Sequence, residues 1–318
     1  MSAAVQLHLG LFGALSVAVC LPHETAAHPV ALGGRPGGLL ALLVMTHGRF
    51  SSRTDLAREL WSGPTEACSA GSFNTLLWRL RRALETPPLH AGDVIECDRQ
   101  GALRIAECVQ VDNDVEHYRR LIEPPMGKPV ERLDGADVAA LRRAVSLYRG
   151  DVLASFRDDW ALRLREKHRR LQLGALSRLM HVCSLHHDWA EAVAHGEAIL
   201  ELDELREDVH RELMRCHLAC GQRALALRQF ERCRSALRRE LAIHPMQETL
   251  QLHQQIADAA VGLAAPPTGP GGMEGPGLHL PAWTGPTSPQ DAAHCIRQAR
   301  WHLAQADAQL QLSLFPHT

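Results

Sequence analysis

The chain has 318 residues, of which 46% are apolar, 22% charged and 4% aromatic. This length suits two domains of ordinary size, each with its own core, and the abundance of Leu and Ala favours helices. The formal net charge is −2, and residues 1–110 hold nine Arg or Lys against nine Asp or Glu, so no overall positive field indicates a nucleic-acid partner. Affinity for an anionic partner must therefore come from local placement of charge.

The cysteines indicate a reducing compartment. There are nine of them, an odd number, scattered without a Cys-x-x-Cys pair, which is typical of reduced, buried thiols rather than of a disulfide framework. Residues 10–21 are apolar, but no Lys or Arg precedes them and the stretch is too short to span a bilayer. We therefore expect a cytoplasmic protein with neither a signal peptide nor a membrane helix.

The chain opens with a strand pattern. Apolar residues keep one parity from Val5 to Leu11 and again from Leu15 to Val19, on either side of Gly13. Alternation of this kind predicts two half-buried strands joined by a turn. A small antiparallel sheet is the expected first element.

Three helices are predicted next. The dense apolar run 39–45 indicates a buried helix, and Ser52 followed three residues later by Asp55 resembles a capping box that opens a second helix over 54–61. A third helix is expected from about residue 69 to 85, because its apolar residues recur at helical spacing. These residues are Phe73, Leu76, Leu77, Leu80 and Leu84.

A hairpin completes the first half. Residues 94–97 and 103–105 are apolar stretches separated by the turn sequence 98–101, which predicts two short antiparallel strands. A sheet, three helices and a hairpin, in this order, form a winged helix-turn-helix. We assign this α+β domain to residues 1–108.

The second half is predicted to be all-helical and tetratricopeptide-like, over residues 111–262. The helical pattern starts at Val111 and is broken at Pro124-Pro125, Gly127 and Pro129, among other places. Ala190, Ala192 and Val193 recur 34 positions later as Ala224, Ala226 and Leu227, which is the tetratricopeptide period. The expected fold class is therefore mainly α, with an N-terminal winged helix-turn-helix followed by this domain.

Two further segments are expected after the repeats. Residues 263–287 are rich in Pro and Gly and are predicted to be a linker. Residues 288–315 keep apolar residues in alternating steps of four and three, which predicts an amphipathic helix with a partner surface.

Nine short motifs, in order, resemble one family. The chain is similar to the bacterial transcriptional activator family, which joins an OmpR-type winged helix to a bacterial transcriptional activator domain, as in the antibiotic regulatory protein class. The motifs occupy residues 55–61 (DLARELW), 79–84 (RLRRAL), 111–115 (VDNDV), 148–153 (YRGDVL), 158–160 (DDW), 207–214 (EDVHRELM), 221–224 (GQRA), 237–241 (LRREL) and 244–245 (HP).

The resemblance implies a sequence-specific, DNA-binding transcriptional activator. Its expected partners are double-stranded promoter DNA with direct repeats, RNA polymerase and a second copy of the chain, with no membrane. The third helix would read the major groove, where Arg can read guanine and Arg, Asn, Thr and Trp can hold phosphates. The candidate DNA-binding residues are Arg53, Asn74, Thr75, Trp78, Arg79, Arg81, Arg82, Arg99 and Arg104.

Some features depart from the family or favour other functions. The wing reads Gly101-Ala102-Leu103-Arg104 where the family has Gly-Tyr-Arg-Leu, so an anchoring aromatic is missing. The basic face of the third helix could be a solvated surface, and the chain could then be an interaction scaffold whose winged domain does not bind DNA.

Neither catalytic nor metal-binding motifs are evident. The sequence has no nucleophile elbow, no His-Glu-x-x-His, no phosphate-binding loop and no dinucleotide fingerprint. We therefore expect that the protein is not an enzyme and that it binds no cofactor. Two groups were weighed as metal sites and rejected because they lack paired ligand spacing. These are His210, Cys216, His217 and Cys220, and His181, Cys183, His186 and His187.

Overall fold

The computed structural model describes residues 5–258, apart from 22, 25, 47 and 62–68. The first element is a four-stranded sheet with strand order β3-β2-β1-β6. Its strands are β1 (Gln6–Gly10), β2 (Ser16–Cys20), β3 (His28–Pro29) and β6 (Gln110–Asn113). β1 runs antiparallel to β2 and parallel to β6.

The predicted strand pair is confirmed. Val5, Leu7, Leu9 and Leu11 are all buried, so the parity in the sequence identifies the face of β1 that packs on the core. The turn between β1 and β2 contains Gly13 with φ of +87°, a conformation that only glycine adopts without strain.

Three helices follow, as predicted. They are α1 (Gly34–Met45), α2 (Arg53–Leu60) and α3 (Ala70–Leu84). The side chain of Ser52 accepts a hydrogen bond from the Asp55 amide, 3.1 Å away, and so caps the first turn of α2. On α3 the five apolar residues predicted to face the core, from Phe73 to Leu84, are each at most 5% exposed.

The hairpin consists of β4 (Ile95–Cys97) and β5 (Leu103–Ile105), paired antiparallel. Ser51 and Leu103 exchange two backbone hydrogen bonds, of 2.8 and 2.9 Å. The segment that leads into α2 therefore anchors the hairpin by backbone pairing, where the family resemblance leads one to expect an aromatic residue.

The structure corrects the prediction that the helical pattern starts at Val111. Residues 110–113 instead form β6, whose Val111 pairs with Leu7 of β1. The chain becomes helical only after Asn113, whose side chain accepts a hydrogen bond from the Glu116 amide at 2.7 Å. The sheet therefore extends past residue 108, the end predicted for the first domain.

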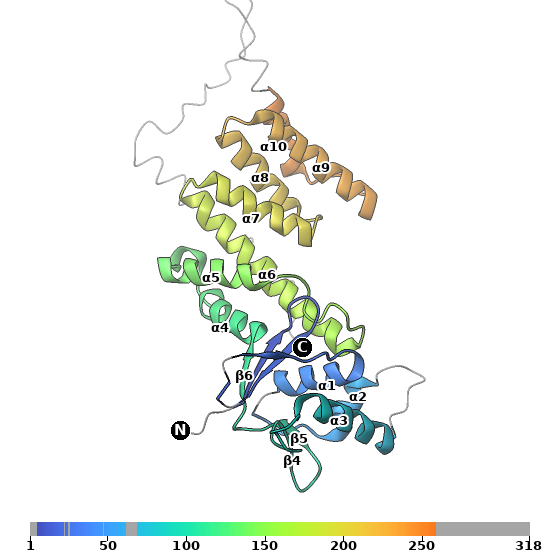
Figure 1. Ribbon diagram of the computed structural model, residues 1–318. Helices are drawn as coiled ribbons and strands as arrows, with labels where there is room; N and C mark the ends of the chain where they lie inside the picture. The colour runs from blue at the N-terminus through green and yellow to red at the C-terminus, as the bar shows by residue number, and fades with distance from the viewer. Residues whose placement is uncertain (1–4, 22, 25, 47, 62–68, 259–318) are drawn as a thin grey trace, which may run out of the picture. The chain divides into compact units, whose positions relative to one another are not determined.

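The second half is helical, as predicted. Its helices are α4 (Asp114–Met126), α5 (Gly135–Leu147), α6 (Asp159–Leu185), α7 (Trp189–Leu202), α8 (Glu207–Ala219), α9 (Arg223–Leu241) and α10 (Gln247–Asp258), with a short 3-10 turn at Val130–Arg132. Successive helices from α6 to α10 pack side by side (Figure 1). Ala192 and Ala226, which are 34 residues apart, are both fully buried near the starts of α7 and α9, so the repeat corresponds to two equivalent helix pairs.

Of the helix breaks predicted at Pro124-Pro125, Gly127 and Pro129, the first does not occur. α4 continues through Pro124 and Pro125 and ends at Met126. Each proline removes one amide donor from the helix, but the Gly127 amide still donates to the Glu123 carbonyl at 3.3 Å. The break therefore falls at Gly127.

The first hairpin of the sheet is held by the helical half. The ring of Phe12 lies edge-on to Tyr118, with ring centroids 5.2 Å apart, and 5.1 Å from that of Tyr148. The Asp114 carboxylate accepts hydrogen bonds from the amides of Leu11 and Phe12 at 2.8 and 3.1 Å. A single apolar core therefore runs from the sheet into α4–α6.

Within the described part of the chain, no helix is long and apolar enough to cross a membrane. The predicted linker at 263–287 and the predicted helix at 288–315 lie outside the described residues.

Candidate nucleic-acid interface

Helix α3 presents a basic face to the outside. It contains three arginines and no Asp or Glu, although the first 110 residues are balanced in charge. Asn74, Thr75, Trp78, Arg79 and Arg82 are exposed, opposite the buried apolar face. Both faces follow from the helical spacing in the sequence.

Trp78 is the most exposed aromatic residue on this face, at 56%. The guanidinium of Arg82 lies over its indole ring, 5.2 Å from the centroid. This cation–π contact orients the indole and the guanidinium beside each other at the surface. The side chain of Arg79 has no hydrogen-bond or ion-pair partner among the described residues, so its charge is not neutralised.

Two hollows flank the exposed face of α3. One, of about 760 Å³, lies between the start of α1 and α3 and is lined by Arg35, Thr75 and Arg79 among others. The other, of about 410 Å³, is lined by Asn74, Trp78 and Arg82 among others. Arg35 could not be identified as part of this surface from the sequence, because about 40 residues separate it from α3 and no local pattern connects them.

Arg53 connects α2, α3 and the wing. Its Nε donates to the Gly101 carbonyl at 2.8 Å, and its Nη1 donates to Oδ1 of Asn74 at 2.7 Å. Because Oδ1 of Asn74 is used inward, the amide nitrogen of Asn74 remains as the donor on the exposed face. Two predicted DNA-binding residues therefore bind each other.

Arg81 turns towards β4 and Glu85 rather than towards the exposed face of α3. Its Nη2 donates to the Ile95 carbonyl at 2.8 Å, and its Nε lies 3.8 Å from the carboxylate of Glu85, which is only 1% exposed. Glu85 also accepts hydrogen bonds from the amides of Val94 and Ile95 at 3.1 and 2.9 Å. Arg81 is therefore the countercharge of a buried carboxylate that fixes α3 against β4.

The two wing arginines differ. Arg104 is 18% exposed and pairs with Glu96 and, at 2.6 Å, with Glu107. The hydrogen bond to Glu96 is the main cause that raises the pKa of Arg104, and its guanidinium also lies 4.4 Å from the ring centroid of Phe50. Arg99, in the turn of the hairpin, is exposed and has no such partner within the described segments.

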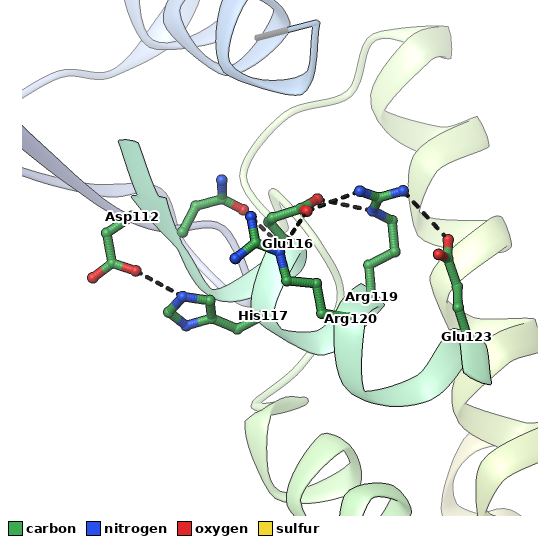
Figure 2. Close-up of polar contacts among 7 residues, drawn as sticks. Asp112, Glu116, His117, Arg119, Arg120 and Glu123 are labelled. Carbon is green, nitrogen blue, oxygen red and sulfur yellow. Dashed lines mark hydrogen bonds and ion pairs between the residues drawn. The ribbon is translucent and has the colours of Figure 1, made fainter. Parts of the chain in front are cut away.

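A second polar cluster lies where β6 meets α4 (Figure 2). Glu116 pairs with Arg119 and Arg120 at 2.8 and 2.9 Å, and hydrogen bonding to Arg119 is the main cause that lowers its pKa. Asp112 binds His117 through one carboxylate oxygen and His8 through the other, each at 3.0 Å. The charges are mutually neutralised and both oxygens of Asp112 are occupied, so this cluster is suited to joining strand and helix.

The fold is that of a winged helix-turn-helix with a basic third helix, continued by a tetratricopeptide-like helical domain. Residues 128–257 match the family model of the bacterial transcriptional activator domain. This match covers the helical part of the chain that follows α4, as far as α10.

The chain is also similar to individual proteins. It is 28% identical to the regulatory protein AfsR of Streptomyces coelicolor over 231 residues, which are 71% of this chain and 22% of AfsR. The chain thus matches about a fifth of that relative's length. Mycobacterium tuberculosis EmbR, solved in complex with a low-affinity phosphopeptide, has the same fold with a TM-score of 0.60 and 18% identity, over 80% of this chain and 66% of EmbR.

Proposed function

We propose that the chain is a sequence-specific, DNA-binding transcriptional activator, and that α3 is the helix that enters the major groove. The observation that carries this proposal is the exposed face of α3, which contains arginines but no carboxylate. Phosphate contacts supply most of the affinity for DNA, and a helix free of acidic groups can approach the phosphates without repulsion.

The nine candidate residues then divide into two roles. Thr75, Trp78, Arg79, Arg82 and Arg99 are exposed and contact DNA directly. The amide nitrogen of Asn74 joins them, since Arg53 holds the amide in one orientation.

Arg53, Arg81 and Arg104 hold the reading surface in place. Each of them donates to carbonyl or carboxylate oxygens of the protein itself. They fix α2, α3 and the wing relative to one another, which sets the geometry of the contacting side chains.

The helical half would arrange protomers on direct repeats or contact RNA polymerase. The buried contact between Phe12 and Tyr118 supports this role, because it couples the sheet of the winged domain to α4. A partner bound to the helices would therefore be held in a fixed position relative to the DNA.

The test is recovery of genomic DNA fragments by the purified full-length chain at two salt concentrations. The Arg79→Ala/Arg82→Ala variant should lose enrichment of a shared repeated motif. A matched control is Arg228→Ala/Arg238→Ala, which removes the same charge from exposed positions of α9. Loss in the first variant alone supports the proposal, whereas equal recovery by both variants would contradict it.

A second function, that of an interaction scaffold, is favoured by one observation. Four apolar residues at the end of α9, in the loop that follows and on α10 are each at least 39% exposed: Leu241, Ile243, Met246 and Leu250. Apolar side chains gathered in this way are typical of an interaction surface. A scaffold without DNA binding predicts no enriched fragments for the wild-type chain and capture of the same partners by the Arg79→Ala/Arg82→Ala variant.

A further inference from the structure

Three potential metal ligands meet where α6 turns into α7. Cys183 lies near the end of α6, and Glu191 and His195 lie four residues apart on one face of α7. Cys183 is 2% exposed, and the side chains of Glu191 and His195 are 29% and 13% exposed. The group is therefore largely shielded from water but remains accessible through Glu191.

The spacing of the three groups approaches that of a tetrahedral site. Sγ of Cys183 lies 3.4 Å from Oε2 of Glu191, and Nε2 of His195 lies 3.5 Å from Oε1. Zinc bound tetrahedrally at its usual bond lengths holds sulfur and oxygen ligands about 3.6 Å apart, and nitrogen and oxygen ligands about 3.4 Å apart. The two measured distances run to different carboxylate oxygens, but one ligand atom from each residue lies within 4.8 Å of the others. A side-chain shift on the order of 1 Å therefore brings the thiol, one carboxylate oxygen and the imidazole to a single ion.

His195 supplies an independent observation. Its Nε2 is buried and has no hydrogen-bond partner among the described residues. A buried polar atom without a hydrogen bond is unfavourable, and such atoms need an explanation.

A catalytic interpretation of the same group fits less well. The carboxylate stands between the thiol and the imidazole, so the imidazole does not contact the sulfur as a general base. Bound zinc would act differently, because it displaces the thiol proton to solvent and forms the Zn–S bond directly.

We propose that Cys183, Glu191 and His195 bind one Zn²⁺ ion, with water in the fourth position. A fourth position open to water makes the site exchangeable rather than purely structural.

Zinc binding would replace Arg142 of α5 as the partner of the Glu191 carboxylate. Its Nε and Nη2 donate to the two oxygens of Glu191, each at 2.6 Å. Zinc competes with the guanidinium for this carboxylate, so binding weakens the link between α5 and α7. The zinc state of the α6–α7 turn is thereby coupled to the packing of the repeats on α5.

The test uses the full-length chain, stripped of metal and titrated with Zn²⁺ and, for spectroscopy, with Co²⁺. We expect one equivalent per chain, and with cobalt a thiolate-to-metal charge-transfer band. Cys183→Ser and His195→Phe should each lower affinity at least about tenfold. The phenylalanine also replaces the unpaired nitrogen, so this variant should fold without metal.

Cys216→Ser is the matched control, because Cys216 is equally buried, on α8. It should keep both the affinity and the cobalt band. The proposal is wrong if the wild-type chain binds less than one equivalent, if cobalt binds without the thiolate band, or if Cys183→Ser and Cys216→Ser have equal affinity. This test is independent of DNA binding.

Discussion

Arg53 and Asn74 are joined by a hydrogen bond of 2.7 Å between guanidinium Nη1 and amide Oδ1. Both residues are predicted from the sequence to bind DNA. In the structure, the guanidinium also binds the Gly101 carbonyl and lies 5.8 Å from the ring centroid of Phe73. One side chain thus connects the start of α2, the recognition face of α3 and the wing.

Replacing Arg53 should affect both stability and binding. Arg53→Ala removes two charge-assisted hydrogen bonds, and we expect unfolding in urea to require about 1–3 kcal/mol less free energy. DNA affinity should fall for all sequences, because the wing and α3 lose their fixed relation. Arg99→Ala, a matched loss of charge at an exposed position, should change stability by less than about 0.5 kcal/mol. Equal stability of the two variants would show that the hydrogen bonds of Arg53 do not hold α2, α3 and the wing together.

Replacing the exposed arginines one at a time should affect the salt dependence of DNA binding differently. For each phosphate contact that is lost, the slope of log K against log salt should decrease by about 0.9. Arg99→Ala, in the wing, should show this change with the same preferred sequence. Arg79→Ala should instead cost about 1–3 kcal/mol on the preferred site and little on others, if Arg79 reads a guanine. Titrations on matched and scrambled sites at several salt concentrations distinguish the two effects.

The helices of the winged domain could be predicted from the sequence because their signals are local. Ser52 and Asp55 are three residues apart, and the buried face of α3 repeats at helical spacing. The strand β6 could not be predicted, since it has only four residues and its partner β1 lies 104 positions earlier. Short strands of this kind form only when the tertiary partner is present.

The same limit applies to single residues. Arg79 and Arg81 are equally basic in the sequence, and only the position of Glu85 and β4 shows that Arg81 is a countercharge. In the sequence, Cys183 stands among histidines that do not form a site with it, whereas the turn between α6 and α7 brings it to Glu191 and His195.

Phe12 should be essential for coupling the two halves. Phe12→Ala removes a buried ring that contacts Tyr118 and Tyr148, and we expect a loss of about 3–5 kcal/mol. Calorimetry should then show two transitions in place of one, because the sheet and α4–α6 no longer share a packed junction. Phe12→Leu, which keeps most of the volume, should retain one transition. A single transition in the alanine variant would contradict the coupling.

His210 should make the stability of the repeats depend on pH. It is 3% exposed, and its Nδ1 lies 2.8 Å from Nε2 of Gln229, whose amide must donate because its Oε1 accepts from Arg232. The other ring nitrogen therefore carries the proton and donates to the Glu204 carbonyl at 3.1 Å. A second proton on the His210 ring would sit on Nδ1 and face the N–H donor of Gln229. The Gln229 amide is held in this orientation by Arg232, which is fixed in turn by Glu197 at 2.7 Å.

Burial is the main cause that lowers the pKa of His210 below its value in the unfolded chain. As pH falls below the unfolded pKa of about 6.5, the unfolded state binds a proton that the folded state does not, so stability decreases. The stability that the neutral His210 contributes is fully present above this pH and is lost as pH falls towards the pKa of the folded state. One proton limits the slope to about 1.4 kcal/mol per pH unit.

Urea unfolding of wild type and His210→Gln between pH 7.5 and 5 measures this effect. The variant should be less stable at pH 7.5, because the Gln229 donor or the Glu204 carbonyl loses its partner, but its stability should depend less steeply on pH. His181→Gln, at an exposed position of α6, should keep the wild-type slope. If His210→Gln kept that slope too, the pH dependence would have to come from another histidine, such as buried His168, whose pKa is lowered in the same direction by desolvation.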